Sequence, residues 1–108
     1  MKIELAKSEV IHFVGIGGIG MSGLALIMQS MGFKIQGSDI SSNRNIERLK
    51  KNKIKITIGH KKQNIIKATI LVISSAIKNS NPEIIEAKKK QLPIYKSCLL
   101  YTSDAADE

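Results

Sequence analysis

Short apolar runs alternate with longer polar stretches along the chain, and in those stretches apolar residues recur every three or four positions. Runs of the first kind are typical of strands, and stretches of the second kind are typical of amphipathic helices. We expect strands at residues 10–14, 33–37, 54–58, 69–74 and 93–96. Helices are expected at residues 20–31, from residues 41–43 to 51 and at 82–90, and a short helix or turn is expected at 63–67. This alternation predicts a single α/β domain with a doubly wound parallel sheet of about five strands.

Residues that favour helix ends support these boundaries. Gly32 follows the first helix and is a candidate for a left-handed C-cap. Residues 41–43, with the sequence Ser-Ser-Asn, offer N-caps for the second helix, and Asn81 followed by Pro82 offers an N-cap and a first helical residue for the last one. Because residues 69–74 form the most continuously apolar run, we expect that strand to be covered on both faces.

The turn between the first strand and the first helix is rich in glycine. Gly15, Gly17 and Gly20 fit the GxGxxG pattern of Rossmann-like domains, and Gly18 adds another position without a Cβ. In that pattern the first glycine allows a tight turn, the second lets backbone approach a diphosphate, and the third lets the helix pack closely on its strand. The amides at the helix start favour phosphate. The plainer alternative is a close-packed turn without a ligand.

Polar residues follow the other predicted strands at the same edge of the sheet. Asp39 can accept hydrogen bonds from ribose hydroxyls or a base N–H, and the hydroxyls of Ser74 and Ser75 can donate to phosphate or sugar. His60 lies at this edge as well. A capping role for Asp39 and simple exposure for His60 remain open alternatives. His12 lies inside the first strand, and we expect it to be structural and to point away from the ligand.

Charge and composition exclude several classes of protein. The formal net charge is +8, but the lysines are spread along the chain and four scattered aromatic residues provide no stacking set for nucleic acid. No apolar stretch approaches the roughly 20 residues of a membrane span. The N-terminus has no apolar secretion signal, and Cys98 is the only cysteine. We therefore expect a cytoplasmic protein without a nucleic-acid or membrane partner.

Five segments carry a family resemblance. They read VGIGGIGMSGLA at residues 14–25, GSD at 37–39, IGH at 58–60, SSAIK at 74–78 and NPE at 81–83. Together they resemble the N-terminal domain of the Mur ligase family, in particular the members that add L-alanine to UDP-N-acetylmuramate in peptidoglycan synthesis. The resemblance runs from residue 9 to residue 95 and implies that residues 1–97 form a domain that binds UDP-N-acetylmuramate.

The resemblance also implies which residues touch this substrate. Those near the diphosphate are Gly15, Gly17, Gly18, Ile19, Gly20, Met21 and Ser22. Asp39 and His60 are expected toward the uridine. The substrate path is expected to be lined by Ser74, Ser75, Ala76 and Ile77. No catalytic residue, cofactor site or metal ligand is expected in this chain.

The activity implied by the resemblance needs more than this chain. In the family, ATP phosphorylates the lactyl carboxylate of the substrate, the amine of L-alanine attacks the acyl phosphate, and Mg²⁺ offsets the phosphate charge. The sequence contains no GxxxxGK[ST] phosphate-binding loop. We therefore expect ATP and Mg²⁺ to bind elsewhere in the parent enzyme, and this chain, about a fifth of a complete ligase, to be inactive alone.

The last eleven residues differ in composition from the rest. Residues 98–108 hold three acidic residues and neither lysine nor arginine, and residues 98–103 resemble the translation of a transposase end sequence used in sequencing libraries. We expect residues 98–108 to be a non-native tail encoded by an adapter. The alternative is a natural, divergent C-terminus.

A second class of function fits part of the same pattern. Gly15, Gly17, Gly20 and Asp39 suit an NAD(P)-binding Rossmann domain of an oxidoreductase or regulatory protein equally well. The dinucleotide pattern does not require the segments at residues 21–23, 59–60 and 74–78, and these favour the ligase interpretation.

Overall fold

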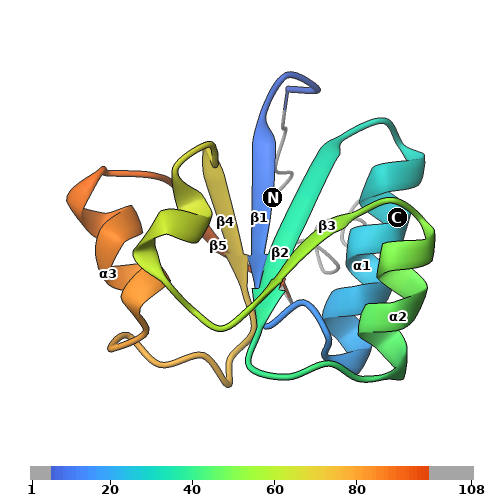
Figure 1. Cartoon of the computed structure of the whole chain (residues 1–108). Coiled ribbons are helices and arrows are strands. Elements are labelled where there is room, and N and C mark those ends of the chain that lie inside the picture. The colour runs from blue at the N-terminus through green and yellow to red at the C-terminus, as the bar shows by residue number, and fades with distance from the viewer. Residues whose placement is uncertain (1–5, 98–108) are drawn as a thin grey trace.

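The computed structural model describes residues 6–97, which form one parallel sheet flanked by helices (Figure 1). The strands are β1 (Val10–Val14), β2 (Lys34–Asp39), β3 (Lys55–Ile58), β4 (Ile70–Ile73) and β5 (Ile94–Lys96). The α-helices are α1 (Ile19–Ser30), α2 (Arg44–Lys51) and α3 (Pro82–Lys89), and η1 (Lys62–Ile65) is a 3₁₀ helix. The strand order is β3-β2-β1-β4-β5. Strands β2 and β3 are added on one side of β1, and β4 and β5 on its other side, so the strand order reverses between the neighbouring strands β1 and β4.

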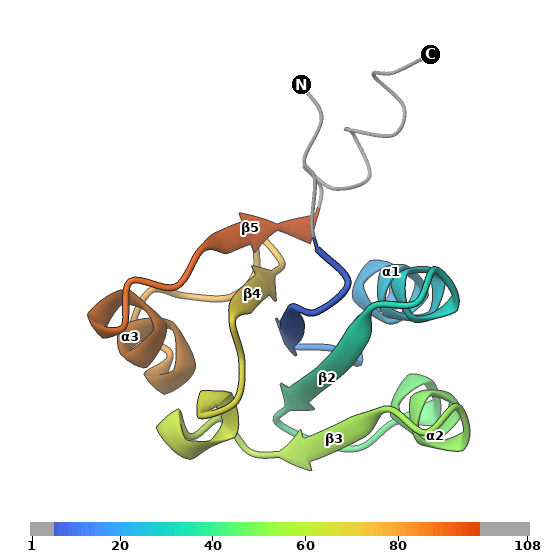
Figure 2. The same cartoon turned by 90° about the horizontal axis from the view of Figure 1, so that it is seen from above.

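Helices cover both faces of the sheet, as the view from above shows: α1 and α2 lie on one side, and η1 and α3 on the other (Figure 2). This arrangement confirms the predicted doubly wound α/β fold. Such sheets bind ligands at the carboxyl ends of the strands, at the point where the strand order reverses. In this chain that point lies at the carboxyl ends of the neighbouring strands β1 and β4.

The two faces are filled by alternate residues of the central strands. Ile11 and Phe13 of β1 belong to the core cluster under α1 and α2, whereas Val14 belongs to the cluster under α3. All three side chains are fully buried. The four residues of β4 are all buried, which confirms that this strand is covered on both faces.

Helix ends follow the predicted signals. Asn43 caps α2 by accepting a hydrogen bond from the Ile46 amide, and Asn81 caps α3, with Pro82 as its first residue. Gly32 has a φ of +99° just after α1, as a left-handed C-cap requires. The second helix therefore begins after Asn43 rather than after either of the two serines that precede it.

The main difference from the expected boundaries is the length of β2. The strand continues beyond Gly37 because Ser38 pairs with Val14 of β1, and Asp39 pairs with Ile58 of β3. Ser38 is therefore a buried strand residue rather than part of a turn. Asp39 is brought to the very end of β2, at the carboxyl edge.

Two further predictions concern the C-terminal tail and membrane-spanning segments. The predicted non-native tail, residues 98–108 including Cys98, lies outside the described residues. Within residues 6–97, no helix has both the length and the apolar character needed to cross a membrane.

Candidate functional site

The glycine loop after β1 lies beside the loop after β4, at the point where the strand order reverses. Gly15 has a φ of +80°, which confirms the tight turn expected there. A Cβ on Gly15 would lie 3.1 Å from Cδ1 of Ile77. The structure thus brings together two of the segments predicted to bind the ligand.

Hydrogen bonds from the first half of the glycine loop fix it to β2. The amides of Gly15 and Ile16 both donate to the carbonyl oxygen of Ser38, at 2.8 and 3.0 Å. The Gly18 amide donates back to the carbonyl of Gly15 at 3.2 Å. These backbone bonds hold the loop in shape without any ligand.

Asp39 closes the loop from the end of β2. Its Oδ2 accepts a hydrogen bond from the Gly17 amide at 2.7 Å, and its Oδ1 accepts one from the Ile40 amide at 2.7 Å. A Cβ on Gly17 would lie 2.8 Å from Oδ2 of Asp39 and 3.0 Å from Ile46. Gly17 is therefore needed for contact with a carboxylate and an apolar side chain of this chain itself.

Two asparagines near the start of α2 also bind the loop, and the sequence patterns did not identify them as loop residues. The side-chain amides of Asn43 and Asn45 donate to the carbonyl oxygen of Gly17, at 3.3 and 3.0 Å. Asn43 was predicted only as a helix cap. The clustering of two asparagines at a helix start was the available signal.

The start of α1 faces the same edge and has no side-chain cap. Gly18 is its N-cap residue and makes no side-chain hydrogen bond, and no acidic residue occupies the first turn. Ile19 is 88% exposed, more than any other large apolar residue in the part of the chain that the structure describes. The positive end of the helix is thus open to an anion.

Met21 and Ser22, also predicted near the diphosphate, lie on the inner side of α1. Both side chains are buried, and the Ser22 hydroxyl donates to the carbonyl of Ile19 at 3.1 Å. The Ser22 amide is used within the helix, since it donates to the Gly18 carbonyl at 2.8 Å. Their contact with substrate stays a prediction.

One expectation about the loop is wrong. Gly20 was expected to let the helix pack closely on its strand, but a Cβ there would meet nothing within 4 Å because Gly20 lies on the exposed side of α1. A close approach of a different kind occurs at Gly37 of β2, where a Cβ would lie 2.8 Å from Ile16 Cβ in the glycine loop and 2.8 Å from the Phe13 carbonyl oxygen of β1.

The loop after β4 places its four predicted residues at the same edge. Ser74 and Ile77 are half-buried and are joined by a hydrogen bond from the Ile77 amide to the Ser74 carbonyl at 3.2 Å. Ser75 and Ala76, at the tip of this turn, are exposed. The turn presents the Ser75 side chain to solvent while Ile77 packs against the glycine loop.

His60 lies in the loop after β3 and is held by the end of β2. Its Nδ1 lies 2.9 Å from the hydroxyl oxygen of Ser38, and its side chain is only 12% exposed. Ser38 in turn donates to Oε1 of Glu83 at 2.7 Å. His60 is therefore tied into a buried polar network rather than simply exposed.

Glu83, from the first turn of α3, is the centre of that network and is fully buried. Its Oε1 accepts hydrogen bonds from His12 and Ser38, both at 2.7 Å, and its Oε2 accepts from the Asn64 side chain at 2.7 Å and the Lys61 amide at 3.2 Å. Burial alone would raise the pKa of Glu83, but the hydrogen bonds that its carboxylate accepts from His12, Asn64 and Ser38 outweigh burial, so the pKa is lowered.

His12 lies inside the molecule, as expected of a structural residue. It is buried between Glu83 and Gln36, whose side-chain amide donates to His12 Nδ1 at 2.8 Å. Nε2 of His12 therefore carries the proton and donates to Glu83. Sequence patterns identified Glu83 only as part of a helix start, because its partners come from distant segments.

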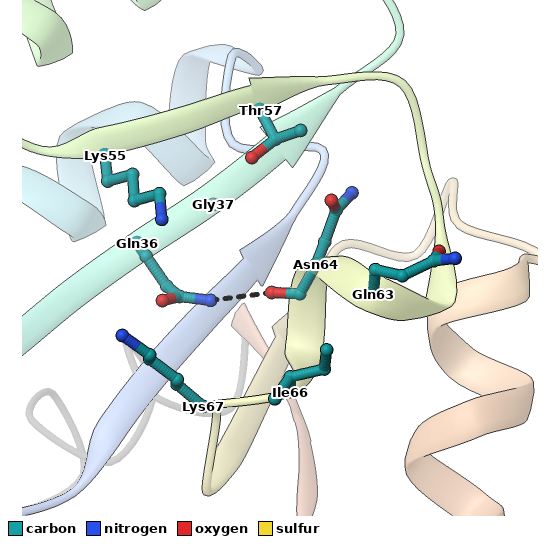
Figure 3. Close-up of a pocket in the computed structure, with 8 residues that line it drawn as sticks. All are labelled: Gln36, Gly37, Lys55, Thr57, Gln63, Asn64, Ile66 and Lys67. Carbon is teal, nitrogen blue, oxygen red and sulfur yellow. Dashed lines mark hydrogen bonds between the residues drawn. The ribbon is translucent and has the colours of Figure 1, made fainter.

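A polar groove of about 220 Å³ lies on the sheet face next to η1, and no sequence pattern predicted it. Figure 3 shows Lys55 and Lys67 extending toward Gln36, whose side-chain amide donates to the Asn64 carbonyl at 3.0 Å. The other lining residues are Gly37, Thr57, Gln63 and Ile66. The glycine loop and the β4–α3 loop do not line this groove.

Known proteins share both the sequence and the fold of this chain. Residues 10–100 match the model of the Mur ligase family, catalytic domain. The UDP-N-acetylmuramate–L-alanine ligase of Pelagibacter ubique is 80% identical over 96 residues, which are 89% of this chain and 21% of that protein. The ligase of the same name from Bartonella bacilliformis is 55% identical over 96 residues, 89% of this chain and 20% of that protein. The chain thus spans about a fifth of the length of these relatives.

Solved structures agree with this match. The UDP-N-acetylmuramate-alanine ligase of Thermotoga maritima superposes with a TM-score of 0.84 at 36% identity, over 92% of this chain and 23% of that one. A UDP-N-acetylmuramate:L-alanyl-gamma-D-glutamyl-meso-diaminopimelate ligase from Neisseria meningitides gives a TM-score of 0.74 at 28% identity, over 82% and 28% of the two chains. The family match covers most of the sequence, and with the shared fold it shows that this chain belongs to the Mur ligase family.

Proposed function

We propose that this domain binds the UDP part of UDP-N-acetylmuramate at the carboxyl edge of its sheet. The observation that carries the proposal is the glycine loop itself, which leads into an α1 start without a side-chain cap and lies against Ile77 of the facing loop. A helix start of this kind offers backbone amides and a positive dipole end to a diphosphate.

Asp39 limits where the diphosphate can lie. Its carboxylate occupies the Gly17 amide and would repel a phosphate brought to the same atom. The diphosphate is therefore expected on the first turn of α1, between Gly18 and Ser22, with Asp39 and His60 on the nucleoside side. Ser74, Ser75, Ala76 and Ile77 would line the path on the opposite side of the loop.

The parent enzyme is proposed to join L-alanine to UDP-N-acetylmuramate with ATP, in the cytoplasm, where ATP and nucleotide sugars are found. The residues in hand do not fit ATP or Mg²⁺. The sequence lacks the phosphate-binding loop, and residues 6–97 bring no three His, Cys, Asp or Glu side chains together as metal ligands. The part that we assign to this chain is substrate binding and orientation.

A calorimetric titration tests the proposal with three ligands side by side: UDP-N-acetylmuramate, NAD and ATP. Binding of UDP-N-acetylmuramate without binding of the other two supports it. Binding of NAD alone would replace it by the dinucleotide-binding alternative, and binding of ATP alone would contradict both.

Ile19→Glu tests the location of the diphosphate. Ile19 is 88% exposed, so a glutamate fits there and suits the positive helix end, but its charge would compete with the diphosphate. We expect roughly tenfold weaker binding of UDP-N-acetylmuramate in the titration, with no loss of stability.

The matched control is Ile85→Glu, which adds the same charge at an exposed position of α3. It is expected to bind like the parent chain. Equal affinity of both variants and the parent chain would contradict the proposed diphosphate position.

A further inference from the structure

A relay of hydrogen bonds connects the buried carboxylate of Glu83 to His60 at the ligand edge. Oε1 of Glu83 accepts from the Ser38 hydroxyl at 2.7 Å, and Ser38 Oγ lies 2.9 Å from Nδ1 of His60. Nδ1 also lies 3.5 Å from Oε2 of Glu83. The three residues of this relay come from three different parts of the fold: α3, β2 and the loop after β3.

The protons in this relay can be assigned by counting donors. Glu83 is ionised near neutral pH because its pKa is lowered, so both of its oxygens only accept. The single hydroxyl proton of Ser38 is used on Glu83, so the oxygen of Ser38 must accept from His60. Nδ1 of His60 therefore carries a proton, and in a neutral imidazole Nε2 then does not.

Nε2 of His60 is available to a ligand. Among the described residues, no side chain or backbone group forms a hydrogen bond with Nε2 of His60. In the same part of the chain, every fully buried side-chain nitrogen or oxygen has a hydrogen-bond partner. Nε2 of His60 is therefore not fully buried and reaches solvent. It presents a lone pair at the edge where Asp39 ends β2.

We propose that Glu83 is a positioning residue: acting through Ser38, it fixes His60 as the Nδ1–H tautomer, so that Nε2 accepts a hydrogen bond from the ligand. The group recognised is a donor of the nucleoside, either the imide N–H of a uracil base or the 2′-hydroxyl of the ribose. Glu83 is fully buried and does not itself touch the ligand. The inference rests on the proposed function.

The tautomer can be measured directly. The chain has two histidines, so a long-range ¹H–¹⁵N correlation spectrum at about pH 8, where a histidine of ordinary pKa is neutral, contains two rings. A His60→Gln variant assigns them. We expect the Nδ1–H pattern for His60 in the parent chain, whereas an Nε2–H pattern would overturn the inference.

Glu83→Gln should reverse the relay. The Lys61 amide and the Asn64 side chain both donate to one oxygen of Glu83, so a glutamine would turn its carbonyl oxygen to them and its NH₂ group to Ser38 and His12. The proton of His12 would then move from Nε2 to Nδ1, and the side-chain amide of Gln36 would turn its oxygen to accept it. Ser38 would then accept from the NH₂ group of the introduced glutamine and donate to Nδ1, which leaves His60 as the Nε2–H tautomer.

Glu86→Gln is the matched control, because Glu86 lies on the same helix and its ion pair with Lys90, at 3.9 Å, is outside the relay. It should leave the spectrum of His60 unchanged. A folded Glu83→Gln chain that keeps the Nδ1–H pattern would contradict the role of Glu83. Should that variant not fold, the spectrum of the parent chain still decides the tautomer.

The ligand part is tested by titrating UDP, its N3-methyl analogue and its 2′-deoxy analogue. One of the two analogues should bind roughly tenfold more weakly than UDP, and the group that it lacks is the donor. In Glu83→Gln, the difference in affinity between UDP and that analogue should be smaller. Equal binding of all three would overturn the ligand contact. A parent chain that binds neither UDP nor UDP-N-acetylmuramate would contradict the proposed function, while the tautomer is judged separately by its spectrum.

Discussion

Two glycines in the loop after β1 have opposite surroundings. A Cβ on Gly17 would lie 2.8 Å from Asp39 Oδ2 and 3.0 Å from Ile46, whereas a Cβ on Gly20 would meet nothing within 4 Å. The GxGxxG pattern treats both as equally required. In the folded chain, only Gly17 is enclosed by its neighbours.

This contrast gives a paired test of stability. Gly17→Ala is expected to lower the free energy of unfolding by about 1–3 kcal/mol, because the loop must shift away from Asp39 and Ile46. Gly20→Ala is expected to raise it by up to about 1 kcal/mol, since alanine favours a helix. Urea unfolding followed by circular dichroism measures both, and equal effects would contradict the packing described at Gly17.

For single residues, sequence patterns predicted which side chains lie at the carboxyl edge of the sheet, but not which hydrogen bonds these side chains form. Gly15 takes the tight turn, and Asp39 and His60 lie at the carboxyl edge as expected. The bond from Gly17 to Asp39 was not predicted, because a pattern of residue types does not show which partner a carboxylate chooses among several nearby donors.

Among the elements, α2 has an N-terminus with two structural roles. Oδ1 of Asn43 accepts from the Ile46 amide at 2.8 Å, while its Nδ2 donates to the Gly17 carbonyl at 3.3 Å. The residue that starts the helix therefore also supports the glycine loop. The order of the helix start and the order of the loop should be linked.

Asn43→Ala is expected to lower the free energy of unfolding by about 0.5–2 kcal/mol through loss of the cap. It should also speed hydrogen exchange in the glycine loop, measured by NMR. Asn43→Ser keeps a capping oxygen but loses the Nδ2 donor, so it should restore most of the stability and little of the loop protection. Complete recovery of both would show that the bond to Gly17 contributes nothing.

Element positions were predictable because each strand and helix carries its own periodic pattern and end signals. Asn43, Asn81 and Gly32 lie at helix ends as their chemistry predicts. The end of β2 was not predictable in this way. Ser38 and Asp39 stay in the strand because β1 and β3 pair with them, and such pairing depends on neighbours distant in sequence.

For the whole molecule, Glu83 makes stability depend on pH. Folding lowers the pKa of Glu83, so its carboxylate stabilises the folded state fully above the unfolded-state pKa of about 4.3. This contribution is lost as the pH falls through the lower folded-state value. We expect the free energy of unfolding to fall below about pH 5, with a shallower fall in Glu83→Gln.

Urea unfolding from about pH 7 to about pH 3 checks this expectation. Glu86→Gln is the control, because Glu86 is not part of the buried network. An equal slope in the parent chain and in Glu83→Gln would show that other carboxylates determine the acid sensitivity.

The fold class of the whole molecule followed from the order of its elements, whereas the buried network did not. The bond from His12 to Glu83 joins residues 71 positions apart, and both the fold and the tautomer are needed to recognise it. Local patterns contain no information of this range.

That separation has a consequence for synthesis on the ribosome. His12, Ser38 and Asn64 emerge early, yet their common acceptor is made only when the chain reaches residue 83. Until then, closing the early half would bury polar groups without a partner, which is costly. We therefore expect the first three strands of the nascent chain to remain incompletely packed until Glu83 has left the exit tunnel. Folding to the native structure should be completed only after that point.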